Sequence, residues 1–330
     1  MRISLKNIII PSIPLAVFLV GFCFVLWMSN YFGQRFSSFP IQNNTLVNSL
    51  QTIFLPNSLL TNIASIILTF INAFLLAQIN NRFTIIRTRT FLPIFIFLML
   101  MGTWNQTHLI NGSNIALTLF IFALFYFFNM SRDRMASEQA FTGSLLISIS
   151  SLLINQFIFI IPICWVAFMI FQSLSLRTFL ASILGALSPW IVYLSVNLLI
   201  NPDINLSQFF VLNFDFNVNF SSISLPDIIY ASSLIVIMII CIFGMYSNMN
   251  KDSMQTRNKL NFLVFLLVSI CLLAIVFRNQ FSFFLPIIAL VYAMLISHPL
   301  TLKQSNFYGI LFIIFCLLNI SFIISKYFIF

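Results

Sequence analysis

Two apolar runs near the carboxyl end decide the fold class of this chain: LNFLVFLLVSICLLAIVF at 260–277 and FSFFLPIIALVYAMLIS at 281–297. A short polar segment, Arg278-Asn279-Gln280, separates them. About 20 apolar residues in a helix cross the hydrocarbon layer of a bilayer, which is about 30 Å thick. Each run is therefore close to the length of one membrane span, and the segment between them predicts a tight turn at the membrane surface.

The composition extends this pattern to the whole chain. Of 330 residues, 61% are hydrophobic and 6% are charged, and the mean hydropathy is +1.06. Soluble domains carry about 25% charged residues, because their surface must face water. The soluble globular, disordered and disulfide-scaffold classes are therefore excluded. The sequence predicts an all-α polytopic membrane protein with a single integral membrane domain over 1–330.

Apolar runs bounded by polar clusters predict about eleven transmembrane helices. No Asp, Glu, Lys, Arg or His lies inside these runs, although several stand at their edges. The first run follows Arg2 and Lys6 without a small-residue cleavage site, so we expect an uncleaved first span. The runs lie at 8–28, 57–78, 91–103, 114–129, 141–153, 157–171, 179–200, 228–246, 260–277, 281–297 and 307–325.

The basic residues predict a cytoplasmic N-terminus. In that orientation twelve of the 15 Lys and Arg residues fall on inner segments, and three, Arg35, Arg278 and Lys326, fall on outer ones. An excess of basic residues on the cytoplasmic side is the usual pattern of inner-membrane proteins. The basic residues stand singly or in threes, with no tract that would follow a phosphate backbone. The expected partner is thus the lipid bilayer, and no nucleic acid is expected.

Three of the runs, 91–103, 141–153 and 157–171, are short for membrane spans. At 1.5 Å per residue each reaches only about 20 Å as a helix. Two alternatives stay open. In the first, these runs are full spans, either extended by their polar flanks or accompanied by local thinning of the bilayer. In the second, 91–129 and 141–171 are re-entrant hairpins that turn within the membrane. Such turns are tolerated where they pack in protein or line a water-filled cavity. We expect that these segments do not all span independently.

The longest polar loop, 201–227, is acidic and predicted to be outside. It contains Asp203, Asp215 and Asp227 and no basic residue. From 212 to 220 apolar residues alternate with amides and Asp215, which is the period of an extended strand. This segment either lies along the membrane surface or covers an outward-facing cavity and presents Asp215 to a polar substrate.

Arg35, His108 and Arg278 are further candidates for substrate binding on the outer side. Both arginines stand outside against the charge bias, and a guanidinium is suited to bidentate contact with phosphate or carboxylate. Clustered with His108, they would form an anion site; alternatively, each is solvated or reaches lipid headgroups at its own position. The chain has no P-loop, HExxH or CxxC pattern, so no cofactor or metal is expected.

Short motifs in the middle of the chain carry a resemblance. They are Ile71-Asn72, Asn81-Arg82-Phe83, 88–92, Phe141-Thr142-Gly143, Ser150-Ser151-Leu152, 174–179, Gly185 and Ser188-Pro189. Through them, 70–198 resembles an uncharacterised family of polytopic inner-membrane proteins from Bacteroidota. The resemblance implies a bacterial inner membrane location and brings no catalytic residue. In architecture the chain is also similar to C-fold multi-pass glycosyltransferases, but 29–56 lacks the acidic residue that those enzymes carry in their first outer loop.

Two classes of function follow. In the first, the protein handles a lipid-linked anionic substrate, a polyprenyl phosphate or glycan, at the outer face through Arg35, His108, Asp215 and Arg278. In the second, it is a non-catalytic membrane subunit or scaffold of a larger envelope complex and binds other membrane subunits. A charge-lined outward cavity would favour the first class. A solidly packed bundle with an exposed flat apolar face would favour the second.

Overall fold

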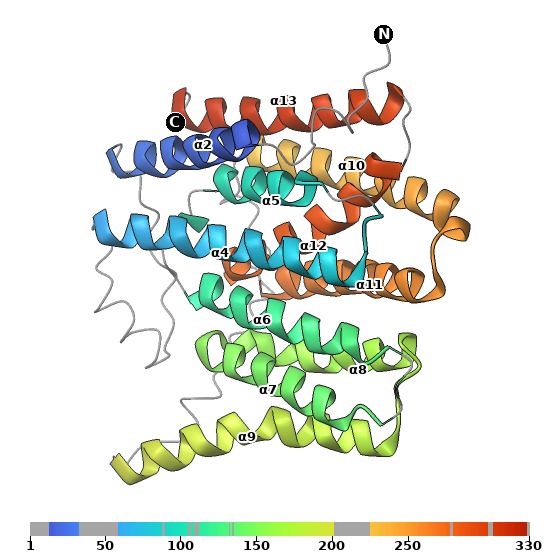
Figure 1. Cartoon of the computed structure of the whole chain (residues 1–330). Coiled ribbons are helices and arrows are strands. Elements are labelled where there is room, and N and C mark those ends of the chain that lie inside the picture. The colour runs from blue at the N-terminus through green and yellow to red at the C-terminus, as the bar shows by residue number, and fades with distance from the viewer. Residues whose placement is uncertain are drawn as a thin grey trace.

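The computed structural model describes residues 13–32, 59–87, 90–104, 107–108, 112–131, 133, 135–200, 225–277, 280–302 and 306–328. These residues are almost entirely helical and include no strand, which confirms the all-α class. The helices lie side by side in Figure 1. They are α2 (Ile13–Phe32), α4 (Leu59–Phe83), α5 (Leu92–Thr103), α6 (Gly112–Asn129), α7 (Ser137–Leu153), η2 (Asn155–Phe159), α8 (Ile160–Ile170), α9 (Leu176–Ile200), α10 (Leu225–Asn248), η5 (Met249–Lys251), α11 (Met254–Val276), α12 (Phe281–Leu302) and α13 (Asn306–Phe328).

Seven helices of the described part are long and apolar enough to cross a membrane. They are α4, α6, α9, α10, α11, α12 and α13. Several apolar helices of membrane-spanning length are what a multi-pass membrane protein requires. The remaining apolar helices, within α2, α5 and η2 with α8, are shorter. The count of eleven spans and the cytoplasmic N-terminus stay predictions.

Helix α12 forms the centre of the bundle. It packs against α5, α6, α10, α11 and α13. In its apolar stretch 94% of the residues are buried, whereas in that of α9 only 17% are buried. Figure 1 shows α12 among its neighbours and α9 at one edge. A membrane helix that is buried all round contacts protein, whereas the exposed leucines of α9 are suited to lipid. Groups carried by α12 are therefore held in the interior of the protein.

Several helices run beyond the apolar runs that predict them. α4 ends at Phe83, five residues past its run, α11 begins at Met254 and α12 continues to Leu302. Ionisable residues at the edges of the apolar runs therefore lie within helices: Arg82, Lys259 and His298 are helical. The physical reason is that a helix ends where its backbone is capped. Ser253 Oγ, for example, accepts a hydrogen bond from the Thr256 amide at the start of α11.

The short segments differ in how far they extend. α7 begins at Ser137, four residues before its predicted start, and η2 begins at Asn155. With these polar flanks, α7 and the η2–α8 pair each reach about 26 Å. α5 has 12 residues, or about 18 Å, and ends where Trp104 is extended. Polar flanks thus lengthen two of the three short segments and not the third.

Close packing joins α7 to α6 and α9. A Cβ added at Gly185 would meet the backbone carbonyl of Phe141, and one added at Gly143 would meet the Phe127 ring. Small residues allow membrane helices to approach in this way. The Trp190 indole also donates to Ser151 Oγ at 2.9 Å. These contacts attach the peripheral helix α9 to the rest of the bundle.

Candidate functional site

Of the four predicted substrate-binding residues, the structure describes His108. Arg35, Asp215 and Arg278 lie outside the described residues, as does the alternating segment 212–220. His108 belongs to the α5–α6 connection, and only 1% of its surface is exposed. Its ring stacks on Trp27 of α2, with ring centroids 3.9 Å apart and an interplanar angle of 26°. His108 is therefore packed in the protein and is not a solvated loop residue.

A chain of hydrogen bonds surrounds the His108–Trp27 stack. Trp27 Nε1 donates to Ser65 Oγ at 3.3 Å, and Ser65 Oγ donates to the Thr107 carbonyl at 3.4 Å. The Asn114 amide donates to the same carbonyl at 3.3 Å. We call Trp27, Ser65, Thr107, His108 and Asn114 the His108 cluster. It links α2, α4 and the start of α6 to one connection.

The polar contacts continue from the His108 cluster along α4. Asn72 Nδ2 donates to the Asn114 carbonyl at 3.3 Å, and Thr118 Oγ1 donates to Asn72 Oδ1 at 2.8 Å. Asn62, Ser65, Thr69 and Asn72 are buried, at spacings that place them on one helix face. Buried polar groups are expensive in a membrane and usually functional there. This polar face of α4 is therefore a hydrophilic part of the described bundle interior.

Ends of other helices converge near the same end of the bundle. Trp104, four residues before His108, contacts Tyr230 of α10 and Phe281 of α12, with ring centroids 6.0 and 6.2 Å apart. Tyr230 also donates to Asn319 of α13 at 2.8 Å. Tyr230 follows the loop 201–227, and Phe281 lies three residues after Arg278. The N-terminal turns of two helices that follow connections predicted to be outside thus contact one tryptophan.

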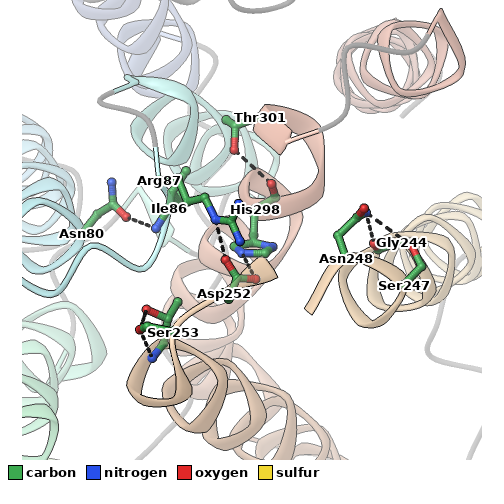
Figure 2. Close-up of polar contacts among 11 residues, drawn as sticks. Asn80, Ile86, Arg87, Gly244, Ser247, Asn248, Asp252, Ser253, His298 and Thr301 are labelled. Carbon is green, nitrogen blue, oxygen red and sulfur yellow. Dashed lines mark hydrogen bonds and ion pairs between the residues drawn. The ribbon is translucent and has the colours of Figure 1, made fainter. Parts of the chain in front are cut away.

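A second cluster, of ionisable side chains, lies at the other end of α4 (Figure 2). Arg87 Nε donates to Asp252 Oδ1 at 2.7 Å. His298 Nε2 lies 3.3 Å from Asp252 Oδ2, at ion-pair distance but without hydrogen-bond geometry. The Asp252 and His298 side chains are fully buried, and that of Arg87 is 36% exposed. We call these three residues the Asp252 cluster; it joins the α4–α5 connection, the start of α11 and the end of α12.

Local hydrogen bonds hold the members of the Asp252 cluster in place. Asn80 Oδ1 accepts from the Ile86 amide at 2.8 Å and closes the turn that presents Arg87. Thr301 Oγ1 donates to the His298 carbonyl at 2.9 Å. Asp252 precedes α11, where the positive end of the helix dipole also favours a carboxylate. Figure 2 shows the side chains of Arg87, Asp252 and His298 pointing toward one another from separate elements.

The Asp252 cluster was not predicted as a site. Arg87 is one of the twelve basic residues of the predicted inner segments, and His298 directly follows the apolar run 281–297. One signal for Asp252 exists: it is one of only six acidic residues in the chain. Its partners have no such signal, because Arg87 is 165 residues away in sequence.

No side chains suitable for a metal gather in the described part of the chain: no group of three or more His, Cys, Asp or Glu is found there. Comparisons with protein-family models, curated proteins and solved structures return no match. The resemblance to the Bacteroidota family and the similarity to glycosyltransferases therefore stay predictions. Any function must be argued from the two clusters and the sequence.

Proposed function

We propose that this protein binds a lipid-linked anionic substrate, a polyprenyl phosphate or a lipid-linked glycan, at the outer face of a bacterial inner membrane. The binding site lies at the bundle end that carries the His108 cluster. Arg35 and Arg278 contact the phosphate, and Asp215 contacts the polar remainder of the substrate. His108, buried against Trp27, lies behind the site. The 212–220 segment covers the site.

The observation that carries this proposal is the convergence around Trp104. Its contacts with Tyr230 and Phe281 bring the helices that follow the 201–227 and 278–280 connections beside the connection that holds His108. The segments that contain Asp215 and Arg278 therefore lead into helices that are neighbours at Trp104. The 33–58 segment, which contains Arg35, begins after α2 and leads into α4, and both helices contribute to the His108 cluster. These contacts support a common site for Arg35, His108, Asp215 and Arg278.

The chemistry of the residues also supports an anionic, lipid-attached substrate. Arginine forms paired hydrogen bonds with phosphate oxygens, and an arginine on the outer side opposes the usual charge bias. A polyprenyl chain would remain in the bilayer beside the helices.

Ligand binding in nanodiscs tests the proposal. Polyprenyl phosphate should bind the wild-type protein, and the uncharged polyprenol should bind at least about tenfold more weakly because the charge-assisted hydrogen bonds are lost. The double variant R35Q/R278Q should lose phosphate binding, whereas the control R132Q/R134Q, which removes the same charge from a predicted inner loop, should keep it. Equal binding by both double variants would contradict the proposal.

A second candidate function is that of a non-catalytic membrane subunit. The observation in its favour is the exposed face of α9, where Leu180, Leu184, Leu187 and Ile191 follow one another at helical spacing. Lipid or another membrane protein would cover such a face equally well. If α9 is an interface, the double variant L184W/L187W should dissociate the complex and leave polyprenyl phosphate binding unchanged. An unaltered particle mass in mild detergent would argue against this role.

A further inference from the structure

The aromatic ring of Phe83, at the end of α4, lies close to two cations. Arg82 Cζ is 6.0 Å from the centroid of this ring and 4.3 Å from that of Phe125 on α6. Lys259 Nζ, from α11, is 4.6 Å from the Phe83 centroid. These distances place the two positive charges no more than about 11 Å apart. Three helices thus bring two cations to one aromatic surface.

Lys259 is unusually buried for a lysine, with 5% of its surface exposed. Lysines are almost never buried to this extent unless they are paired. No carboxylate of the described residues lies within 4.0 Å of Lys259 or of Arg82. The attraction of a cation for an aromatic ring is weaker than its loss of hydration on burial. An anion next to both cations would compensate for that loss.

The acidic residues that the structure describes do not supply that anion. At this end of the bundle, Asp252 is engaged by Arg87 and His298, and Asp133 accepts from the Met135 amide on the exposed surface. Of the others, Glu138 is exposed in the first turn of α7, and the remaining three belong to the acidic loop 201–227, predicted to lie on the opposite side. A ligand must therefore provide the negative charge.

The surface next to Arg82 indicates the kind of ligand. Ile67, Ile71 and Phe74 are exposed and follow one face of α4 that leads to Arg82. In a membrane this apolar face contacts acyl chains, and Arg82 stands at the end where lipid headgroups begin. A lipid lying along α4 would place its phosphate beside Arg82, with Lys259 behind the Phe83 ring.

We infer that Arg82 and Lys259 form a binding site for the phosphate of an anionic phospholipid, with its headgroup seated against Phe83 and Phe125. The guanidinium fork pairs with two phosphate oxygens, and the ammonium supplies a point charge. Arg87 does not belong to the site, because Asp252 neutralises it. The site lies at the opposite end of α4 from the His108 cluster and is independent of the proposed substrate site.

Native mass spectrometry of the delipidated protein with phosphatidylglycerol and phosphatidylcholine tests this inference. The wild type should retain phosphatidylglycerol preferentially, and R82Q/K259M should bind it at least about tenfold more weakly. The variant K259R, which keeps the charge, should bind as the wild type does. The matched control is R177Q, which removes an exposed arginine whose contact is with Met135 Sδ at 3.7 Å; its binding should change less than about twofold.

Two results would overturn the inference. One is equal retention of phosphatidylglycerol by R82Q/K259M and the wild type. The other is complete displacement of the lipid by millimolar inorganic phosphate, which would show that the site takes a free anion. If the double variant does not fold, R82Q alone decides, because Arg82 is exposed and its replacement leaves the buried packing intact.

Discussion

Replacing Asp252 with Asn should destabilise the protein, because this single carboxylate holds three elements together. It accepts from Arg87 at 2.7 Å and faces His298 at 3.3 Å, and its side chain is fully buried. The amide that replaces it has nearly the same shape and can still accept one hydrogen bond. The variant therefore removes charge and leaves the packing in place.

The expected loss is about 2 kcal/mol. A hydrogen bond to a charged group contributes about 1.5–3 kcal/mol, and breaking a fully buried ion pair costs about 3–5 kcal/mol. The Arg87 side chain is 36% exposed, so water compensates part of its lost partner and the value falls below the buried limit. For a chain of this size, 2 kcal/mol corresponds to a fall in Tm of about 4 °C.

A double-mutant cycle separates the ion pair from other effects. The free energy of unfolding would be measured in mixed micelles for R87Q, D252N and R87Q/D252N. The double variant should be more stable than the sum of the single losses predicts, with a coupling energy of about 1–2 kcal/mol. The control is D133N, which removes an exposed carboxylate at the same end and should change stability by less than about 0.5 kcal/mol.

Additive effects in this cycle would refute the reasoning. A coupling energy near zero would mean that Arg87 and Asp252 do not interact in the folded protein. A loss in D133N as large as that in D252N would show that net charge, and not the buried contact, determines stability.

Three further predictions concern architecture. Reporter fusions after Lys259 and after Phe330 should report the cytoplasm and the exterior respectively, and the same side for both would disprove the predicted topology. A cysteine at Asn155 should react poorly with a membrane-impermeant reagent if 141–171 is re-entrant; ready reaction would indicate a true outer turn. Gly185→Ala should destabilise by about 1–3 kcal/mol, because the added methyl group meets the Phe141 carbonyl, and an unchanged Tm would show that α7 and α9 separate easily.

Composition and apolar runs were sufficient to predict the class of fold and the place of each helix. The run at 281–297 lies within α12, for example, and the run at 228–246 lies within α10. These signals are local, because each membrane helix forms its backbone hydrogen bonds within itself and its length appears in the sequence as an apolar stretch. Helix ends were harder to predict from the sequence, because capping residues such as Ser253 determine them.

The sites were harder to predict, because they depend on contacts between distant segments. His108 was selected as a candidate, but nothing in its neighbourhood in the sequence indicates that it stacks on Trp27. The charge bias did place Arg87, Asp252 and His298 in segments of one side, and the structure brings them together. Which of many loop residues on that side would meet depends on how the helices pack, and apolar composition carries no information about that.

Photo-crosslinking with a polyprenyl phosphate probe tests the proposed function most directly. The protein in nanodiscs would be irradiated with a probe that carries its reactive group beside the phosphate, and the labelled residues would be identified by mass spectrometry. The proposed site predicts labels in 29–56, around His108 and near Arg278, and their loss in R35Q/R278Q. Labels found only at the opposite end, around Arg82 and Lys259, or labels that persist in that double variant, would contradict it.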